Sequence, residues 1–320
     1  MAEKKSFKKY ILGLWALFVL LVAGVAFFFA TIAWGWFGDM PTFEELENPE
    51  SNLASEIYSA DQVLLGKYYI ENRSNVNYAD LSPHLINALL ATEDIRFRNH
   101  SGIDMKSLLR VAYGVMTGNH KGGGSTITQQ LAKNLFPRDM NLTTSELVMR
   151  KFKEWITAVK LERNYSKNEI IAMYLNTVAF GSQSFGIQSA ARTFFDKTPM
   201  EVKIEEAALL VGVVNAPTRY SPILNPDNAF DRRNLVIGQM EKYDFISGQK
   251  KDSLVKQPID MSNYNVMSHK TGIARYFREH IRGKLRNWAK SHYKPDGEPY
   301  NLYKDGLKIY TTINSRMQEL

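Results

Sequence analysis

An uninterrupted apolar run near the N-terminus is the feature that most constrains what this chain can fold into. No charged residue lies between Tyr10 and Gly38, a stretch longer than the roughly 20 apolar residues that span the hydrocarbon core of a bilayer. A cleaved signal peptide carries a shorter apolar region of about 7–15 residues that ends in small residues. Here bulky aromatic residues continue as far as Phe37. The run therefore predicts an uncleaved transmembrane helix over residues 10–38.

Charges on either side of the run predict its orientation. Lysines precede it at positions 4, 5, 8 and 9, and acidic residues follow it at positions 39, 44, 45, 47 and 50. Because positive flanks stay on the cytoplasmic side of a membrane, residues 1–9 should form a cytoplasmic tail. We therefore expect a single-pass protein whose body, after about residue 39, lies on the other side of the membrane.

Composition restricts the chemistry of this exported body. The chain has no cysteine, which excludes disulfide bridges, thiolate metal ligands and thiol nucleophiles. Its formal net charge is +7, with lysine and arginine concentrated between Lys133 and Lys167. Outside the cytoplasm, anionic lipid headgroups or a pyrophosphate-bearing substrate are better partners for this charge than nucleic acid.

The sequence predicts a mainly helical body over residues 81–245, preceded at 39–80 by an extended segment with short β-like runs at 56–58 and 63–70. Ser82 and Pro83 supply an N-cap and an N1 proline for the first helix. Apolar residues at helical spacing predict a buried stripe on the longest helix, formed by Val148, Phe152, Trp155, Ile156 and Val159. Further helices are expected at residues 105–116, 125–136, 144–164, 167–176, 187–195, 204–214 and 228–242.

Residues 246–320 differ from this body. They are polar and rich in lysine and tyrosine, and Leu307, Ile309, Thr311 and Ile313 alternate as in a strand. A strand needs partners, and the sequence does not show an obvious one. We interpret this region as a linker and the beginning of another structural unit.

Chemistry-bearing residues concentrate in four segments. In the first, Glu93 and Asp94 end an apolar helix and precede Phe97 and His100, so one carboxylate can lie at the edge of a cleft and act as a general base. A solvated helix end is the alternative. In the second, Gly124, Ser125 and Thr126 begin a helix whose free N–H groups can bind an anion, although a plain capped helix has the same pattern.

The amides and cations of the second and third segments lie at helical spacing. Gln129, Gln130 and Lys133 fall within about one turn and can face sugar and phosphate oxygens. In the third segment Arg150 precedes Glu154 by one turn, which keeps that carboxylate ionised or, alternatively, makes an ordinary surface ion pair. The fourth segment, 165–176, reads as an amphipathic helix with a good cap.

Taken together and in this order, the four segments resemble the glycosyltransferase family found in class A penicillin-binding proteins and in monofunctional peptidoglycan glycosyltransferases. The shared motifs are ED-x-x-F-x-x-H-x-G, GGSTITQQLAKN, RK-x-x-E and SK-x-x-I-x-x-YLN. The resemblance covers residues 55–240 and implies a lysozyme-like helical domain. At the C-terminus, DGLKIYTTINSRMQ resembles the lead into a transpeptidase domain, so we expect that domain to lie outside this sequence.

The resemblance also implies an activity and roles for individual residues. Glu93 would be the base that deprotonates the 4-hydroxyl of the acceptor N-acetylglucosamine of lipid II, with inversion at the anomeric carbon and release of undecaprenyl pyrophosphate. Glu154 would assist at the donor side. The longer loop leaves Arg138 as the available counterpart of a family arginine, and Ala172 stands where the family usually has glutamate. The implied substrate-binding positions are Asp94, Phe97, His100, Gly124, Ser125, Thr126, Gln129, Gln130, Lys133, Asn134, Arg138, Arg150 and Lys151.

The implied setting is the bacterial inner membrane, with lipid II, the growing glycan strand and other cell-wall synthesis proteins as partners and no nucleic acid. No cofactor is required by this reading, and a role for Mg²⁺ at the pyrophosphate stays open, because no His/Asp/Glu cluster has ligand spacing. Two other functions are weighed against the polymerase. Two glutamates on a helical scaffold also describe a membrane-bound lytic muramidase, and a catalytically silent scaffold for cell-wall assembly is the third reading.

Overall fold

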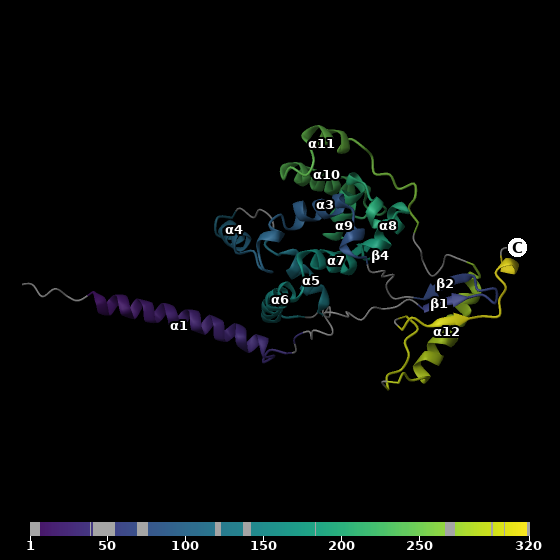
Figure 1. Ribbon diagram of the computed structural model, residues 1–320, viewed down its shortest axis with the longest axis horizontal. Helices are drawn as coiled ribbons and strands as arrows, with labels where there is room; N and C mark the ends of the chain where they lie inside the picture. Colours follow the sequence, from purple (N-terminus) through teal and green to yellow (C-terminus); the bar gives the residue numbers. More distant parts are fainter. Residues whose placement is uncertain are drawn as a thin grey trace, which may run out of the picture.

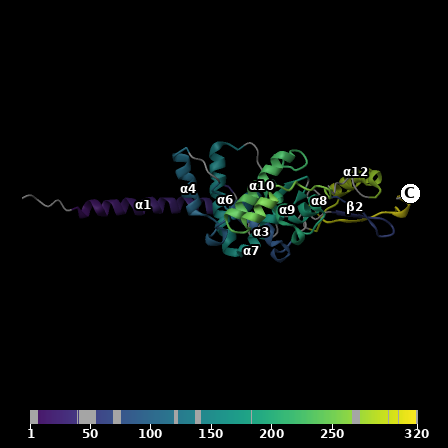
Figure 2. The ribbon, with the colours of Figure 1, turned by 90° about the horizontal axis from the view of Figure 1, so that it is seen from above.

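The computed structural model describes residues 7–38, 40, 55–68, 76–118, 123–136, 142–182, 184–265, 273–295, 297–303 and 305–318. An apolar helix, a helical body and a small sheet unit follow one another along the longest axis (Figures 1 and 2). The flanking charges at residues 1–6, 39 and 41–50, on which the predicted orientation partly depends, lie outside the described residues.

The N-terminal helix α1 spans Lys8–Ala33. An 18-residue window of it has a mean hydropathy of 2.7 and none of that window is buried in the protein, so by length and composition it is able to cross a membrane. Its C-terminal end is different. Thr31 and Ile32 are buried, and the rings of Phe28 and Phe29 lie edge-on to Phe152 of the body at 5.4 and 5.5 Å. One end of the helix is therefore fixed to the body, and the rest is left free for a lipid environment.

The body is mainly helical, as the sequence predicts, and its helix starts follow from local chemistry. Ser82 caps the first helix by accepting from the His84 N–H, with proline at the next position. Thr143 and Ser166 both form capping boxes with a glutamate three residues later. The helices of the body are α3 (Pro83–Glu93), α4 (Met105–Met116), α5 (Ile127–Leu135), α6 (Thr144–Asn164), α7 (Lys167–Thr177), α8 (Ile187–Phe195), α9 (Ile204–Val214), α10 (Pro226–Lys242) and α11 (Gly248–Leu254).

The core of the body forms around α9, which is apolar on all sides and buried from Ala207 to Val213. It packs against α3 and α10, while α5 packs against α6 and α7. A short hairpin of β3 (Ala179–Gly181) and β4 (Ser184–Phe185) follows α7. The group of α3, α9 and α10 and the group of α5, α6 and α7 therefore share one apolar core. The end of α3 meets the start of α5 between the two groups.

The buried stripe predicted for α6 is wrong. Val148 is exposed, and Phe152, Trp155, Ile156 and Val159 are only partly buried. The buried positions are instead Glu154, Thr157, Ala158 and Leu161. The physical reason is that α5 packs against the face that carries Glu154, while Phe152 on the other face meets the end of α1. Apolar periodicity identified the face that meets the apolar anchor helix rather than the face that meets the core.

The small unit joins two parts of the chain that the sequence analysis treated separately. Its sheet has the order β2-β1-β5, from β1 (Ser55–Tyr58), β2 (Leu64–Tyr68) and β5 (Lys308–Tyr310). β1 pairs antiparallel with β2 and parallel with β5, with Ile57 opposite Ile309. The strand expected near the C-terminus therefore does have a partner, and that partner lies about 250 residues earlier in the chain.

A helix that the sequence analysis did not predict completes this unit. α12 spans Arg275–Ser291, and its Ile281 and Leu285 pack with Ile57 and Leu65 of the sheet. The Arg278 side chain is buried and lies directly over Gly66, where any Cβ atom would collide with the guanidinium. A glycine in β2 therefore permits the helix to lie against the sheet.

Candidate active site

A cleft of about 710 Å³ opens between α5, α6, the end of α7, β3 and the segment after α9. Eight of the residues proposed from the sequence line it. They come from two separate motifs, which only the packing of α5 against α6 brings together. The eight are Ser125, Gln129, Gln130, Lys133, Asn134, Arg150, Lys151 and Glu154.

Glu93 reaches the cleft through Gln130. It is the last residue of α3, because the next residue leaves the helical conformation with φ −160° and ψ 76°. Its Oε2 accepts a hydrogen bond of 2.8 Å from Nε2 of Gln130. The side chain is only partly buried, so the carboxylate is held on one side and open on the other. Glu93 itself is not among the residues that line the cleft, so its role as a base stays a prediction beside the alternative of a solvated helix end.

Glu154 is a buried carboxylate with cations beside it. Only 4% of the residue is exposed, which removes the ordinary surface ion pair as an alternative. Lys151 Nζ lies 2.8 Å from Oε2, and Arg150 Nε lies 3.9 Å from Oε1. Lys151 also donates to Oγ of Ser125 at 3.2 Å, so it joins α6 to the start of α5.

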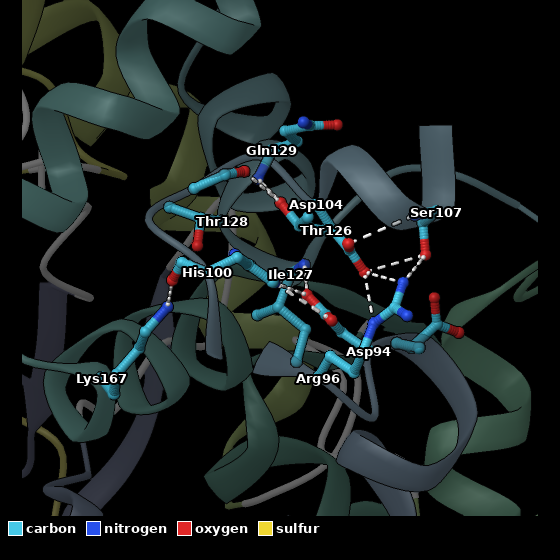
Figure 3. Close-up of polar contacts among 12 residues, drawn as sticks. Asp94, Arg96, His100, Asp104, Ser107, Thr126, Ile127, Thr128, Gln129 and Lys167 are labelled. Atoms are coloured by element: carbon cyan, nitrogen blue, oxygen red, sulfur yellow. Dashed lines mark hydrogen bonds and ion pairs between the residues drawn. The ribbon is translucent and has the colours of Figure 1, made fainter. Parts of the chain in front are cut away.

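Asp94, Phe97 and His100 are not among the residues that line the cleft. Figure 3 shows the contacts of Asp94 and His100 near the start of α5. Asp94 is buried, accepts from the backbone N–H of Ile127 at 3.1 Å and lies 3.0 Å from Nε2 of His100. The ring of Phe97 is fully buried. These contacts connect the end of α3 to the start of α5, and therefore fix the position of the Gln130 amide relative to Glu93. Their assignment as substrate-binding residues stays a prediction.

The loop behind the cleft is fixed at two further points. Thr126 caps α5 by accepting from the Gln129 N–H, and its own hydroxyl donates to the Gly102 carbonyl at 2.7 Å. Asp104 caps α4 and accepts two hydrogen bonds from the guanidinium of Arg96, at 2.7 and 3.0 Å. Burial opposes the charged form of Asp104, but the bonds from Arg96 and Ser107 outweigh it and lower the pKa of Asp104 to about 2.

Gly124 is not among the lining residues of the cleft, and Gln129 is among them but is almost fully buried. Gly124 lies where an added Cβ would be 3.1 Å from the side chain of Val111, so the start of α5 approaches α4 closely. Gln129 is 1% exposed, and neither polar atom of its amide has a hydrogen-bond partner among the described residues. Arg138 lies outside the described residues.

Sequence reasoning missed several lining residues of this site, and Tyr174 is the one that contacts a proposed site residue. Tyr174 of α7 lines the cleft, and its hydroxyl donates to Oε1 of Gln130 at 3.0 Å. Its motif, YLN, was recognised as one of the four segments but given no chemical role. The signal that could have found it is a polar tip on the apolar face of a helix, because a buried tyrosine hydroxyl usually has a hydrogen-bond partner.

Residues 61–241 match the family model described as Transglycosylase. The chain belongs to this family. Glycosyl transfer uses a carboxylate near an acceptor hydroxyl and positive charge near a leaving group, and the cleft is lined by Glu154, Lys133, Arg150 and Lys151. The mainly helical fold with one N-terminal apolar helix agrees with the fold predicted from the sequence.

Curated relatives of this transglycosylase are longer proteins. Penicillin-binding protein 1A of Pseudomonas aeruginosa is 33% identical over 306 residues, which are 95% of this chain and 35% of that protein. Penicillin-binding protein 1A of Aquifex aeolicus is 35% identical over 314 residues, 98% of this chain and 40% of that protein. A crystal structure of penicillin-binding protein 1A from Haemophilus influenzae overlaps at 22% identity with a TM-score of 0.47, over 84% of this chain and 28% of that one. The chain therefore spans 35–40% of the length of the first two penicillin-binding proteins and 28% of the crystallised chain.

Three cationic side chains line the cleft of this transglycosylase. Lys133, Arg150 and Lys151 all line it, and among them Lys151 and Arg150 face Glu154. The described residues contain no group of three or more His, Cys, Asp and Glu side chains placed to hold a metal ion. A role for Mg²⁺ at the pyrophosphate stays a prediction.

Proposed function

We propose that this chain is a peptidoglycan glycosyltransferase that polymerises lipid II into glycan strands with inversion at the anomeric carbon. The observation that carries the proposal is a pair of carboxylates held by residues of one cleft: Glu154 lines the cleft, and Glu93 accepts from Gln130, which lines it. Glu93 is half-exposed and held by an amide, and Glu154 is buried between two cations. Membership of the transglycosylase family supports transfer of a sugar between glycan chains rather than another use of the same cleft.

In this mechanism Glu93 acts on the acceptor. Its carboxylate takes the proton of the 4-hydroxyl of the acceptor N-acetylglucosamine while that oxygen forms a bond to C1 of the donor N-acetylmuramic acid. The bond from C1 to the pyrophosphate oxygen breaks, and undecaprenyl pyrophosphate leaves with the electron pair. Because pyrophosphate is already a good leaving group, it needs neighbouring cations more than a proton donor.

The donor side of the cleft supplies those cations. Lys133, Arg150 and Lys151 line the cleft. Glu154 accepts a hydrogen bond from Lys151 and lies 3.9 Å from Nε of Arg150, so it orients both cations. Preorganised charge of this kind stabilises the transition state because it does not have to reorganise during the reaction. We assign Glu154 the role of orienting these cations at the donor pyrophosphate.

The position of α6 supports a lipid-linked substrate at a membrane surface. The same helix presents Arg150 to the cleft and Phe152 to the end of α1. If α1 crosses the membrane with its N-terminus in the cytoplasm, the cleft lies beside the outer surface of the inner membrane. Donor and acceptor lipids can then reach it without leaving the bilayer.

A lytic muramidase is the second candidate, because it would use the same pair of carboxylates with water as the nucleophile. The three cations of the cleft favour the polymerase, since cleavage of a finished glycan releases an uncharged sugar hydroxyl. Incubation with lipid-linked disaccharide or with purified sacculi separates the two functions. The polymerase lengthens the first substrate, and the muramidase shortens the second.

The Glu93→Gln variant tests the proposed base. A glutamine here can still accept the hydrogen bond from Gln130 but cannot take a proton, so polymerisation should fall by about 10²–10⁴-fold while lipid II binding persists. Glu241→Gln on α10, which does not line the cleft among the described residues, is the control for loss of one charge. Thermal unfolding must first show that both variants are folded. A folded Glu93→Gln protein that polymerises at a near wild-type rate would overturn the assignment of Glu93 as the base. The hypothesis of a catalytically silent scaffold predicts that result.

A further inference from the structure

Three side chains from three helices form one directed line of hydrogen bonds that ends at the proposed base. Tyr174 of α7 donates to Oε1 of Gln130 on α5 at 3.0 Å. Nε2 of the same amide donates to Oε2 of Glu93, at the end of α3, at 2.8 Å. Tyr174 itself is fully buried in the core of the body. The base is therefore connected to a fixed point of the interior through a single amide.

The direction of these bonds is determined by chemistry. An ionised carboxylate can only accept hydrogen bonds, so the NH₂ group of Gln130 must face Glu93 and its carbonyl oxygen must face Tyr174. The tyrosine hydroxyl then has to donate. Burial, and to a smaller extent the nearby charge of Glu93, raises the pKa of Tyr174 far above its usual range, so the hydroxyl keeps its proton at any working pH.

The Tyr174 hydroxyl also restrains the Gln130 amide, which could otherwise adopt other orientations. Gln130 lines the open cleft and lies one turn from Lys133. Without Tyr174, its side chain could rotate away from Glu93 into the cleft, or turn its carbonyl oxygen toward the carboxylate. Either change would leave Glu93 without the donor that holds Oε2. With the donor in place, Oε1 of Glu93, which has no hydrogen-bond partner among the described residues, can face an acceptor hydroxyl.

We propose that Tyr174 is a positioning residue for the transfer reaction, which acts through Gln130 to hold the Glu93 carboxylate in its working orientation. This inference rests on the proposed function, because it needs Glu93 to be the base. It assigns Tyr174 no contact with the reacting sugars, although the residue lines the cleft. Its effect should therefore appear in the rate of the chemical step and should depend on the presence of the Gln130 amide.

A double-mutant cycle tests this dependence. Tyr174→Phe removes only the hydroxyl, and Gln130→Met keeps the length of the side chain but removes its amide. We expect Tyr174→Phe to lower kcat about 3–10-fold, the range for one uncharged hydrogen bond, and Gln130→Met to lower it about 10–100-fold. In the Gln130→Met background, adding Tyr174→Phe should change kcat by less than about 2-fold, because the hydroxyl has lost the group through which it acts.

The chain provides a matched control for the loss of a tyrosine hydroxyl. Tyr264 donates to Oγ of Ser182, also at 3.0 Å and in a partly buried position. Tyr264→Phe should leave kcat unchanged. All variants are assayed as full-length protein in vesicles with lipid II, after thermal unfolding has shown how much each substitution destabilises the fold.

The outcomes separate the positioning role from its alternatives. If the losses from Tyr174→Phe and Gln130→Met multiply in the double variant, Tyr174 acts independently of the amide, and the proposal is overturned. A raised KM with unchanged kcat in Tyr174→Phe would show direct contact with substrate and would also overturn it. A wild-type protein that does not polymerise lipid II overturns the proposed function and this inference together, whereas an active wild type with additive variants overturns only the inference.

Discussion

Replacing Asp104 with asparagine should destabilise the protein at neutral pH but much less in acid. Asp104 is 6% exposed, and its two carboxylate oxygens have different partners. Oδ2 accepts from the Arg96 guanidinium and the Ser107 hydroxyl, and Oδ1 accepts from the backbone N–H groups of Lys106 and Ser107. Asparagine has one acceptor oxygen and one NH₂ group. Its NH₂ group would therefore face either the Arg96 and Ser107 side chains or the two backbone N–H groups, all of which are donors.

The pKa of Asp104 gives the size of the effect. It falls from 3.8 to about 2 in the folded protein, and each pKa unit corresponds to about 1.4 kcal/mol. The ionised carboxylate therefore stabilises the fold by about 2 kcal/mol near neutral pH. Because the folded pKa is the lower one, this stabilisation is complete well above pH 3.8 and is lost as the pH falls through about 2. About half of it remains at pH 3.

Thermal unfolding of wild type and Asp104→Asn at pH 7 and pH 3 measures this difference. At pH 7 the variant should melt about 4–8 °C lower, since 1 kcal/mol shifts the melting temperature of a domain of this size by about 2–4 °C. At pH 3 the difference in melting temperature between wild type and variant should be about half of its value at pH 7. Asp252→Asn, whose side chain is 70% exposed on α11, is the control for loss of a surface carboxylate. An equal gap at both pH values would refute the electrostatic reasoning, and no gap at pH 7 would refute the assigned hydrogen bonds.

Three further predictions follow from the fold and the cleft. Gly102→Ala should destabilise the protein by roughly 2–4 kcal/mol in thermal unfolding, because φ there is +90° and the new Cβ would lie 2.9 Å from the Ala158 carbonyl group; a loss below about 1 kcal/mol would contradict this. Glu154→Gln should lower the polymerisation rate and also change donor affinity, because its two cations lose their counter-charge, and steady-state kinetics with unchanged kcat and KM would exclude that role. Removal of residues 1–38 should give a more soluble protein that polymerises lipid II less efficiently in vesicles, and equal turnover with and without them would show that α1 only tethers the body.

Much of the helical body could be predicted because its determinants are local. The helices at 105–116, 144–164, 187–195 and 204–214 have the bounds expected from capping residues and apolar spacing. N-caps, N1 prolines and capping boxes act over three or four residues, so a sequence shows them directly. The same local signals identified the segments that carry Glu93, Gln130 and Glu154, although only the resemblance predicted that these segments meet at one site.

Errors arose where one helix meets two different neighbours. The predicted apolar stripe on α6 is not buried in the core: its Phe152 meets the end of α1, and the polar-looking face that carries Glu154 is the buried one. Periodicity shows that two faces differ, and it does not show which neighbour each face meets. The same limit hid Tyr174, since its role depends on the Gln130 amide, which lies 44 residues earlier.

The sequence by itself determined an apolar helix long enough for a bilayer, a helical body with its element boundaries, and the residue types of the chemistry. These follow from composition and from interactions within one or two turns. Only the tertiary structure decided that β5 pairs with β1 across about 250 residues, that a glycine at position 66 admits Arg278, and that Tyr174, Gln130 and Glu93 form one line. Long-range pairing of this kind depends on which surfaces fit together after the local elements have formed, and no local pattern in the chain encodes it.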